Sequence, residues 1–332
     1  MQLIFKLGKI PVLSIAEIIT VLKSRNLSYD IINANRYFLH LKINNNIYPD
    51  ILLNILGGTR EIFKVDTIVS TKDARRVKKQ FKFNLDNSTT ALGFTITESI
   101  KSYKEREFKK PYSDIKNGMI PVKLAKIMVN LGIQDNTTAI YDPFCGTGTI
   151  ITEGLLQGLN VYGSDINTDQ VKGTIKNMEW IIEQYNLDKN IKFEIFEHNA
   201  TTMPDKLKAK DDNISIVTEP YLGELWTSKI NKGTKNLKTI AKVDKSIEKS
   251  IKSVSKILKN HQRLVIIIPA FRIKHETMYL KVRDKEFMGL KKVPFISDII
   301  TFENKELSDI MSIMYKRRNT LILREIFIFE KT

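Results

Sequence analysis

The chain has 332 residues, 42% of them hydrophobic, with 53 Lys and Arg against 37 Asp and Glu. This length allows two domains with separate cores. We find neither an apolar run long enough to span a membrane nor a secretory signal, so we expect a cytoplasmic protein without a membrane partner. One cysteine, Cys145, and four histidines argue against a disulfide and against a metal site.

The net charge of +16 indicates a polyanionic partner, and we expect nucleic acid. The basic residues are unevenly spread, because the segments 72–82 (KDARRVKKQFK) and 101–110 (KSYKEREFKK) are especially rich in them. The alternative is that the lysines reflect the codon usage of an AT-rich genome and only cover the surface.

The first 75 residues predict a small α+β domain of ferredoxin-like type. Helix signals alternate with strand signals, and Ser14 is the expected N-cap of the first helix. Residues 76–117 are expected to be a basic connector with a hairpin around 81–97. The predicted elements are strands 2–7, 37–43 and 61–70 and helices 14–25 and 48–56.

Residues 118–332 predict an α/β domain with a doubly wound, Rossmann-like sheet. Apolar runs alternate with amphipathic helices, and a turn at 317–319 precedes an antiparallel last strand. The predicted helices are 121–131, 149–158, 168–186 and 236–259, and the predicted strands are 138–142, 160–164, 191–197, 213–218, 263–269, 295–303 and 320–330.

The segment Asp142–Ile150 (DPFCGTGTI) predicts a loop that binds a nucleotide-like ligand. It follows a buried strand and precedes a helix, and its two glycines, Gly146 and Gly148, allow close approach of the backbone. Asp165 ends the next strand about 17 positions after Gly148, close to the spacing of a ribose-binding acid. An ordinary tight turn and a nucleophilic Cys145 are the alternatives. No histidine lies near Cys145 in the sequence.

The same segment resembles motif I of S-adenosylmethionine-dependent methyltransferases, especially the tRNA guanine-N2 methyltransferases of the guanosine-10 type. Other segments resemble this family too. They are residues 7–17, 56–59, 118–125 (GMIPVKLA), 218–223 (TEPYLG) and 323–326 (LREI). The resemblance implies a class I methyltransferase domain. Relatives usually carry a full THUMP domain, but residues 70–118 are too few for one, so we expect it to be reduced or missing. An accessory subunit could replace its surface.

The resemblance implies S-adenosylmethionine as cofactor. Asp142 would meet its ammonium group, Asp165 its ribose, and Asn199 its adenine in place of the usual acid. The other cofactor-binding residues that the resemblance implies are Met119, Pro121, Pro143, Phe144, Gly146, Gly148, Thr149 and Ala200.

The loop Thr218-Glu219-Pro220-Tyr221 departs from the (Asp/Asn)-Pro-Pro-Tyr of relatives that methylate amino groups. In those relatives the first side chain orients the target amine and the aromatic ring stacks on the base. Aligned on Pro220 and Tyr221, Thr218 takes the first position, but only Glu219 carries a carboxylate. A turn capped by Thr218 with a surface Glu219 is the structural alternative.

We therefore predict an RNA methyltransferase that forms N2-methylguanosine in tRNA. The alternatives are an N6-adenine methyltransferase acting on DNA or rRNA, and a non-catalytic RNA-binding protein that keeps the cofactor fold. Lysines recur in steps of three and four along the predicted helix 236–259, either as a solvated face or as an RNA contact.

Overall fold

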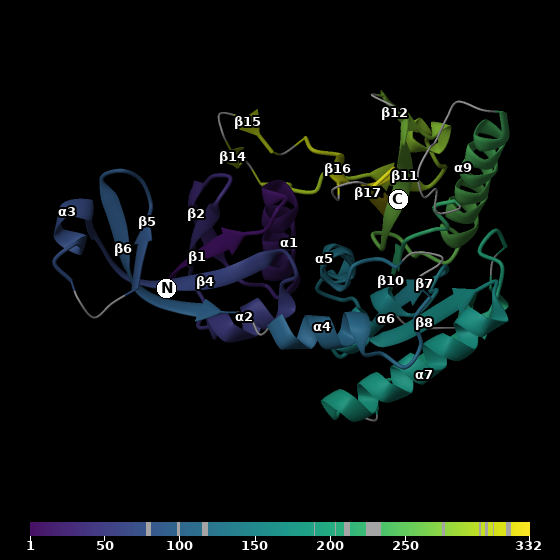
Figure 1. Ribbon diagram of the computed structural model, residues 1–332, viewed down its shortest axis with the longest axis horizontal. Helices are drawn as coiled ribbons and strands as arrows, with labels where there is room; N and C mark the ends of the chain where they lie inside the picture. The colour runs from purple at the N-terminus through teal and green to yellow at the C-terminus, as the bar shows by residue number, and fades with distance from the viewer. Residues whose placement is uncertain are drawn as a thin grey trace. The chain divides into compact units, whose positions relative to one another are not determined.

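The computed structural model describes residues 1–77, 81–97, 100–114, 119–188, 190–202, 204–208, 213–223, 234–273, 276–298, 300–302, 305–307, 309–316 and 320–332 (Figure 1). The chain divides into two compact units. One comprises Met1–Lys101 with Ile296–Asp309, and the other comprises Ser102–Phe295 with Ile310–Thr332. No described helix is long and apolar enough to cross a bilayer.

The first unit contains the predicted ferredoxin-like arrangement. Its first strands lie in the order β2-β3-β1-β4, and each neighbouring pair is antiparallel. Strand β2 was missed because its sequence, YDIINA, has polar residues typical of a half-exposed edge strand. The elements are β1 (Gln2–Leu7), α1 (Pro11–Ser24), β2 (Tyr29–Ala34), β3 (Phe38–Ile43), α2 (Pro49–Ile55), β4 (Thr59–Ser70) and α3 (Thr71–Ala74).

The prediction that Ser14 caps the first helix is wrong. Helix α1 begins at Pro11, whose fixed φ suits the first helical position, and its N-cap Ile10 makes no side-chain capping bond. Ser14 is buried inside the helix, and its hydroxyl donates to the carbonyl oxygen of Gly58 at 2.8 Å. It therefore ties α1 to the turn before β4.

The predicted hairpin is present as β5 (Phe81–Asn84) and β6 (Thr89–Thr97), which extend the sheet beyond β4. Strands β3 and β5 are four positions apart in the sheet, and a flat sheet would separate them by about 19 Å. Yet the ring centroids of Phe38 and Phe83 lie 5.3 Å apart. The sheet therefore curls, and its helix-free face encloses a small core around Phe63 and Ala91.

The predicted strand 295–303 is not part of the large sheet. Residues Ile296–Asp309 belong to the first unit, where Lys23 Nζ donates to Asp298 Oδ1 at 2.7 Å. A two-stranded ribbon forms there from β14 (Thr301–Phe302) and β15 (Lys305–Glu306). Residues 295–303 are apolar enough to predict a central strand, but long-range packing against α1 and β2 decides their place. The predicted turn 317–319 lies outside the described residues.

The second unit is the predicted doubly wound sheet, with the described strands in the order β13-β17-β11-β10-β7-β8-β9. Strands β7 to β11 are parallel along this path, while β17 is antiparallel to β11, as predicted for the last strand. These strands are β7 (Ala139–Asp142), β8 (Asn160–Asp165), β9 (Phe193–Glu197), β10 (Ile214–Thr218), β11 (Arg263–Ile273), β13 (Leu290–Lys292) and β17 (Ile322–Lys331), and β12 (Glu276–Tyr279) and β16 (Ser312–Tyr315) pair with β11 and β17.

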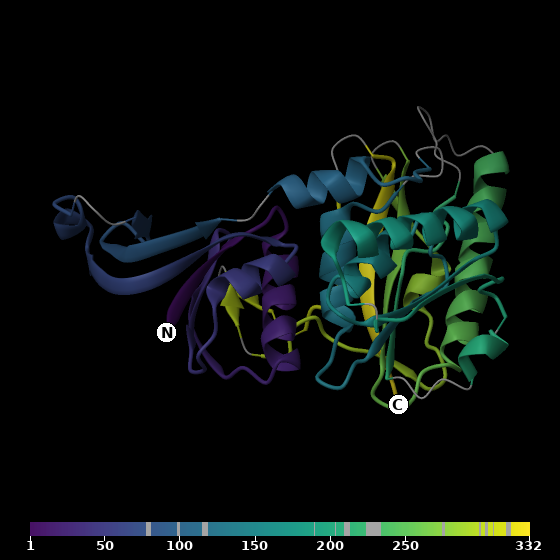
Figure 2. The ribbon, with the colours of Figure 1, turned by 90° about the horizontal axis from the view of Figure 1, so that it is seen from below.

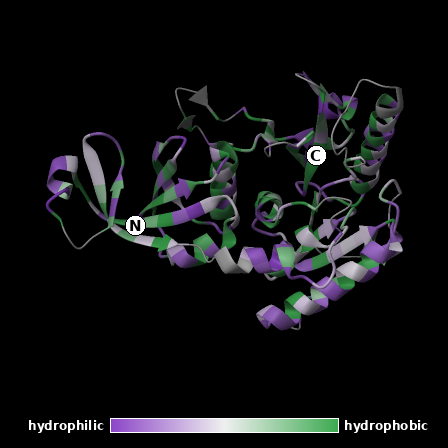
Figure 3. Ribbon diagram, viewed as in Figure 1, coloured by the Kyte–Doolittle hydropathy of each residue, from purple (hydrophilic) through white to green (hydrophobic). Residues whose placement is uncertain are grey.

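Helices cover both faces of this sheet (Figure 2). On one face α9 packs its apolar residues Ile240, Val243, Ile247 and Ile251 against the buried side chains of β10 and β11. Hydrophobic and hydrophilic residues alternate along α7 and α9, as expected for helices with one buried side (Figure 3). The described helices of this region are α4 (Ile100–Phe108), α5 (Val122–Gly132), α6 (Thr149–Leu155), α7 (Thr168–Tyr185), α8 (Asp205–Lys208), α9 (Thr234–Val254) and the 3-10 helix η1 (Lys281–Asp284).

Connections leave β7 and its neighbour β10 in opposite directions, which makes the boundary between them the switch point of the sheet. In doubly wound folds ligands bind beyond the carboxyl ends of the strands at this point. Asp142 ends β7 and Thr218 ends β10. The two loops that the sequence singled out therefore begin side by side.

Candidate active site

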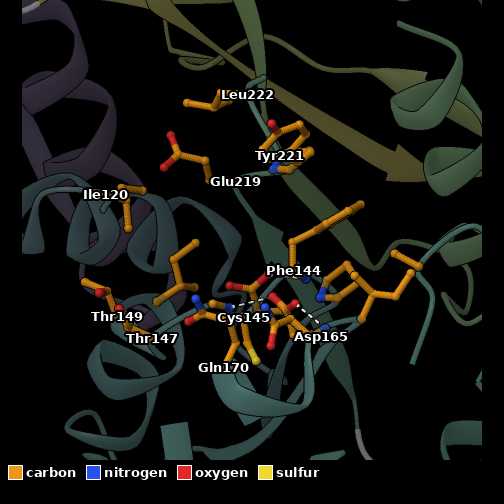
Figure 4. Close-up of a pocket in the computed structure, with 18 of the residues that line it drawn as sticks. Ile120, Phe144, Cys145, Thr147, Thr149, Asp165, Gln170, Glu219, Tyr221 and Leu222 are labelled. Atoms are coloured by element: carbon orange, nitrogen blue, oxygen red, sulfur yellow. Dashed lines mark hydrogen bonds between the residues drawn. The ribbon is translucent and has the colours of Figure 1, made fainter. Parts of the chain in front are cut away.

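A cavity of about 430 Å³ lies beyond the carboxyl ends of β7, β8 and β10. The loop after β7 contributes one wall, and Glu219, Pro220 and Tyr221 from the loop after β10 contribute another (Figure 4). The predicted cofactor residues that line it are Met119, Asp142, Pro143, Phe144, Gly146, Thr149, Asp165, Asn199 and Ala200. Most of the predicted site thus surrounds one space.

The loop after β7 is fixed by its own backbone and by neighbouring helices. Gly146 and Gly148 adopt positive φ angles of 50° and 80°, which L side chains rarely adopt. A Cβ on Gly148 would also lie 2.8 Å from Thr174 Cγ2. The Thr174 hydroxyl donates to the carbonyl oxygen of Gly146, and Asn177 Nδ2 donates to that of Thr147. Glycine is therefore required at these two positions.

Asp165 closes this loop from the next strand. Its Oδ2 accepts the N–H of Gly146 at 3.0 Å, and its Oδ1 accepts the N–H of Asn167 at 2.9 Å. A carboxylate has about four acceptor positions, so each oxygen can still accept a hydroxyl of a bound ribose. Burial raises the pKa of Asp165, and the backbone N–H groups of Asn167, Gly146 and Ile166 oppose that rise.

Asp142 is fully buried beneath the same cavity. Burial raises its pKa to about 7, although the Thr218 hydroxyl and the Phe144 N–H both donate to its Oδ1 and oppose the rise. The negative charges of Asp165 and Glu219 raise it further. Asp142 and Asp165 thus place negative charge beside one cavity, which favours a cationic ligand.

Thr218 does not line the cavity. It is the last residue of β10, only 1% exposed, and its hydroxyl donates to Asp142 Oδ1 at 2.6 Å. Glu219 is consequently the first residue of the loop, at the position from which a side chain reaches the ligand. This arrangement favours Glu219 over Thr218 for contact with a target amine.

Glu219 is held by Arg324, which the sequence placed in the last strand but not in the site. Arg324 on β17 donates from Nε to Oε1 and from Nη2 to Oε2 of Glu219, and both side chains are 11% exposed. The guanidinium of Arg324 occupies two of the roughly four acceptor positions of the carboxylate and leaves the others for a ligand. Because 105 residues separate the two partners, no local pattern predicts this pair.

The remaining predicted residues take less direct positions. Asn199 lines the cavity, but its Oδ1 accepts both the N–H and the hydroxyl of Thr201, so the adenine contact predicted for that oxygen competes with an internal turn. Gly148 and Pro121 do not line the cavity and instead precede α6 and α5 as their N-caps. Tyr221 is half-exposed beside Leu222 at the cavity wall.

The segment 101–110 is not wholly the surface patch that its composition suggested. Arg106 is buried in an ion pair with Glu153, its Nε lying 2.7 Å from Oε1. Lys110 Nζ donates to the hydroxyls of Thr147 and Thr149, and burial lowers its pKa to about 8. These two cations hold the cofactor loop and its helix, and are not available to nucleic acid.

Cys145 is buried in the same loop, and desolvation raises the pKa of its thiol well above the ordinary value. A neutral thiol is a weak nucleophile, so the alternative of covalent catalysis loses its support. Among the described residues no cluster of His, Cys, Asp and Glu could hold a metal ion.

Comparison with known proteins identifies this unit. Residues 111–268 match the model of the RMKL-like methyltransferase domain family. The chain thus carries a methyltransferase domain that is similar to this family. The match covers every residue that lines the cavity but not Arg324. The resemblance to methyltransferases is thereby confirmed, and S-adenosylmethionine is the cofactor that this class implies.

Two archaeal relatives extend the comparison. The chain is 38% identical over 111 residues to a probable tRNA (guanine(10)-N2)-dimethyltransferase of Methanothermococcus thermolithotrophicus, covering 33% of this chain and 65% of the relative. It is 28% identical over 240 residues to the tRNA (guanine(10)-N2)-dimethyltransferase of Methanocaldococcus jannaschii, covering 65% and 66%. In both cases the match spans just under two thirds of the relative's own length. The methyltransferase domain thus resembles enzymes of the family predicted from motif I.

A solved structure shows the same fold. The structure of TrmN from Thermus thermophilus aligns over 100% of both chains with a TM-score of 0.55, at 11% sequence identity. The Rossmann-like methyltransferase sheet with its N-terminal α+β part is thus confirmed as a known arrangement of elements.

Proposed function

We propose that this chain is an S-adenosylmethionine-dependent RNA methyltransferase that forms N2-methylguanosine in tRNA. The observation that supports it most is the shared cavity, where the cofactor loop and Glu219, a carboxylate of the loop after β10, face the same space. The archaeal relatives named above direct the proposal to guanine N2 in tRNA.

The charges of the cavity fit this cofactor. S-adenosylmethionine carries a sulfonium and an ammonium group, and when bound it supplies a methyl group that needs little activation. Asp142 would accept the ammonium through Oδ2, because Oδ1 already accepts two internal hydrogen bonds. Asp165 would hold the ribose through the acceptor positions that Gly146 and Asn167 leave open.

The target amine would be oriented by Glu219. Its carboxylate, fixed by Arg324, can accept an N–H of the amine and so direct the nitrogen lone pair along one line. Pro220 turns the chain so that its carbonyl can accept the second N–H, and Tyr221 offers a face for the base to stack on. The residues mainly position and orient the reactants, and Thr218 acts only through Asp142.

The partner is proposed to be RNA, with tRNA as substrate. The exposed residues Arg75 and Arg76 support part of the predicted basic surface, although Arg76 lies 3.8 Å from Asp73. Lys78 and Lys79, predicted with them, lie outside the described residues. We also propose an accessory subunit and a cytoplasmic location, and both proposals rest on the sequence alone.

The test is transfer of a labelled methyl group to unmodified tRNA, followed by mass spectrometry of the nucleosides. N2-methylguanosine would support the proposal. N6-methyladenosine would favour the adenine alternative. Cofactor binding without transfer to RNA or DNA would instead indicate a non-catalytic protein.

A further inference from the structure

Helix α9 carries one sign of charge along its outer side. Lys238, Lys242, Lys245, Lys249 and Lys252 are all exposed, opposite the apolar side that packs on the sheet. They form two rows, one of Lys242 and Lys249 and one of Lys238, Lys245 and Lys252. Neighbours in a row are seven positions apart in the sequence. Seven residues correspond to about 10.5 Å along a helix.

Nothing within the described chain neutralises most of these charges. Lys252 pairs with Glu248, which also binds Lys285, and Asp244 accepts the N–H of Val282. Lys238, Lys242, Lys245 and Lys249 make no hydrogen bond or ion pair with any described residue. Like charges three and four positions apart destabilise a helix, whereas a face selected only for solubility interleaves both signs. The lysines therefore repel one another and destabilise the helix, and a bound polyanion would remove this repulsion.

The rows run past the mouth of the active-site cavity. Ser246 of α9 lines that cavity, and Lys242 and Lys249 lie one turn before and one turn after it on the same side of the helix. The floor of the cavity is acidic, with Asp142 and Asp165. Phosphates are repelled from the floor and attracted to α9, whereas an uncharged base can enter between them.

We infer that the lysine rows of α9 bind the phosphate backbone of the RNA strand whose base enters the cavity. The inference rests on the proposed function for the identity of the nucleic acid. Neighbouring lysines of a row, about 10.5 Å apart, can each contact a different phosphate of one strand. Contacts of this kind position the strand without reading its sequence.

The test compares two triple variants with equal loss of charge. The first replaces Lys242, Lys245 and Lys249 by Gln. The control replaces Lys172, Lys176 and Lys192, which are exposed, do not line the cavity, and lie on and after α7. Fluorescence anisotropy with a labelled tRNA transcript gives the dissociation constant over a range of KCl concentrations. Calorimetry with S-adenosylhomocysteine and thermal melting check the cofactor site and the fold.

We expect the α9 variant to bind RNA roughly 10- to 100-fold more weakly at 0.15 M salt, with a log-log salt slope flatter by about two units. The control should stay within about threefold of the wild type, and both should keep their cofactor affinity. Unchanged RNA binding by the α9 variant, or an equal loss in the control, would overturn the inference. If the wild type binds RNA through α9 but transfers no methyl group, the proposed function is contradicted and the inference about α9 stands. If methyl transfer at subsaturating RNA is unchanged by the α9 substitutions, the inference about α9 is contradicted and the proposed function stands.

Discussion

The two loops of the active site begin on neighbouring strands but are held in different ways. The loop after β7 is fixed by Asp165, Thr174 and Asn177, all within about 31 positions of it. The loop after β10 places Glu219 against Arg324, 105 residues away. The first loop is a self-contained binding element, whereas the second depends on the last strand of the sheet. Cofactor binding and catalysis should consequently respond separately to substitution.

The largest effect is expected for Glu219→Gln, which tests whether the two loops act separately. The amide keeps the size of the side chain but loses the charge that pairs with Arg324 and accepts the amine. We expect the single-turnover rate of methyl transfer to fall about a hundredfold, the usual scale for one positioned group, with a much smaller change in cofactor affinity. Rapid-quench kinetics and calorimetry measure the two. Loss of cofactor affinity equal to the loss of rate would show that the loops are not separable.

Asp142→Asn tests the first loop with little change of shape. The variant can keep the oxygen that accepts from Thr218 and Phe144 and replaces only Oδ2 by an amino group. Affinity for S-adenosylmethionine should fall roughly 10- to 100-fold, since a hydrogen bond to a charged group contributes about 1.5–3 kcal/mol. Wild-type affinity should rise with pH through about 7, because Asp142 must ionise to meet the ammonium. The variant should lack that rise, and an identical pH profile would contradict the assignment.

The same variant has a matched effect on stability. Burial raises the pKa of Asp142 from its ordinary 3.8 to about 7, so the folded state binds a proton more readily than the unfolded state. This contribution to the free energy of unfolding is complete below about pH 4 and is lost as the pH rises through about 7. Urea unfolding across this range should show a decline in the wild type that is absent from Asp142→Asn.

Asp165→Ala removes the ribose acceptors and also the partner of the Gly146 N–H. We expect cofactor affinity to fall at least about tenfold, because about 1.4 kcal/mol already corresponds to that factor. Asp165→Asn, which retains an acceptor, is the matched control and should recover part of the affinity. A folded Asp165→Ala protein with wild-type affinity would remove this residue from the cofactor site.

The smallest effect is expected for Thr218→Val, which preserves the shape of the side chain and removes the hydroxyl. Loss of its hydrogen bond raises the pKa of Asp142 further, because that bond lowers it in the wild type. At pH 7 the KM for the cofactor should rise a few-fold, and the deficit should shrink at higher pH as Asp142 ionises. A fall in kcat like that of Glu219→Gln would return the catalytic position to Thr218.

The sequence by itself determined the first loop and most of the sheet. Strand periodicity, two glycines at positive φ and an acid at the next strand end are local features, and local features suffice when the partners lie on adjacent elements. The same reasoning predicted the hairpin β5–β6 and the antiparallel last strand. Most of the cofactor residues that were named from the sequence line one cavity in the structure.

The other features follow from contacts between segments that are far apart in the sequence. The apolar residues within 295–303 predict a strand of the large sheet, but contacts of Asp298 with α1 and β2 place residues 296–309 in the first unit. Arg106 and Lys110 look like surface cations in the sequence, yet packing against Glu153, Thr147 and Thr149 turns them inward. Glu219 acquires its orientation from Arg324 on a distant strand. Charge and hydrophobicity are properties of one residue, whereas burial and pairing depend on segments that the chain brings together only when it folds.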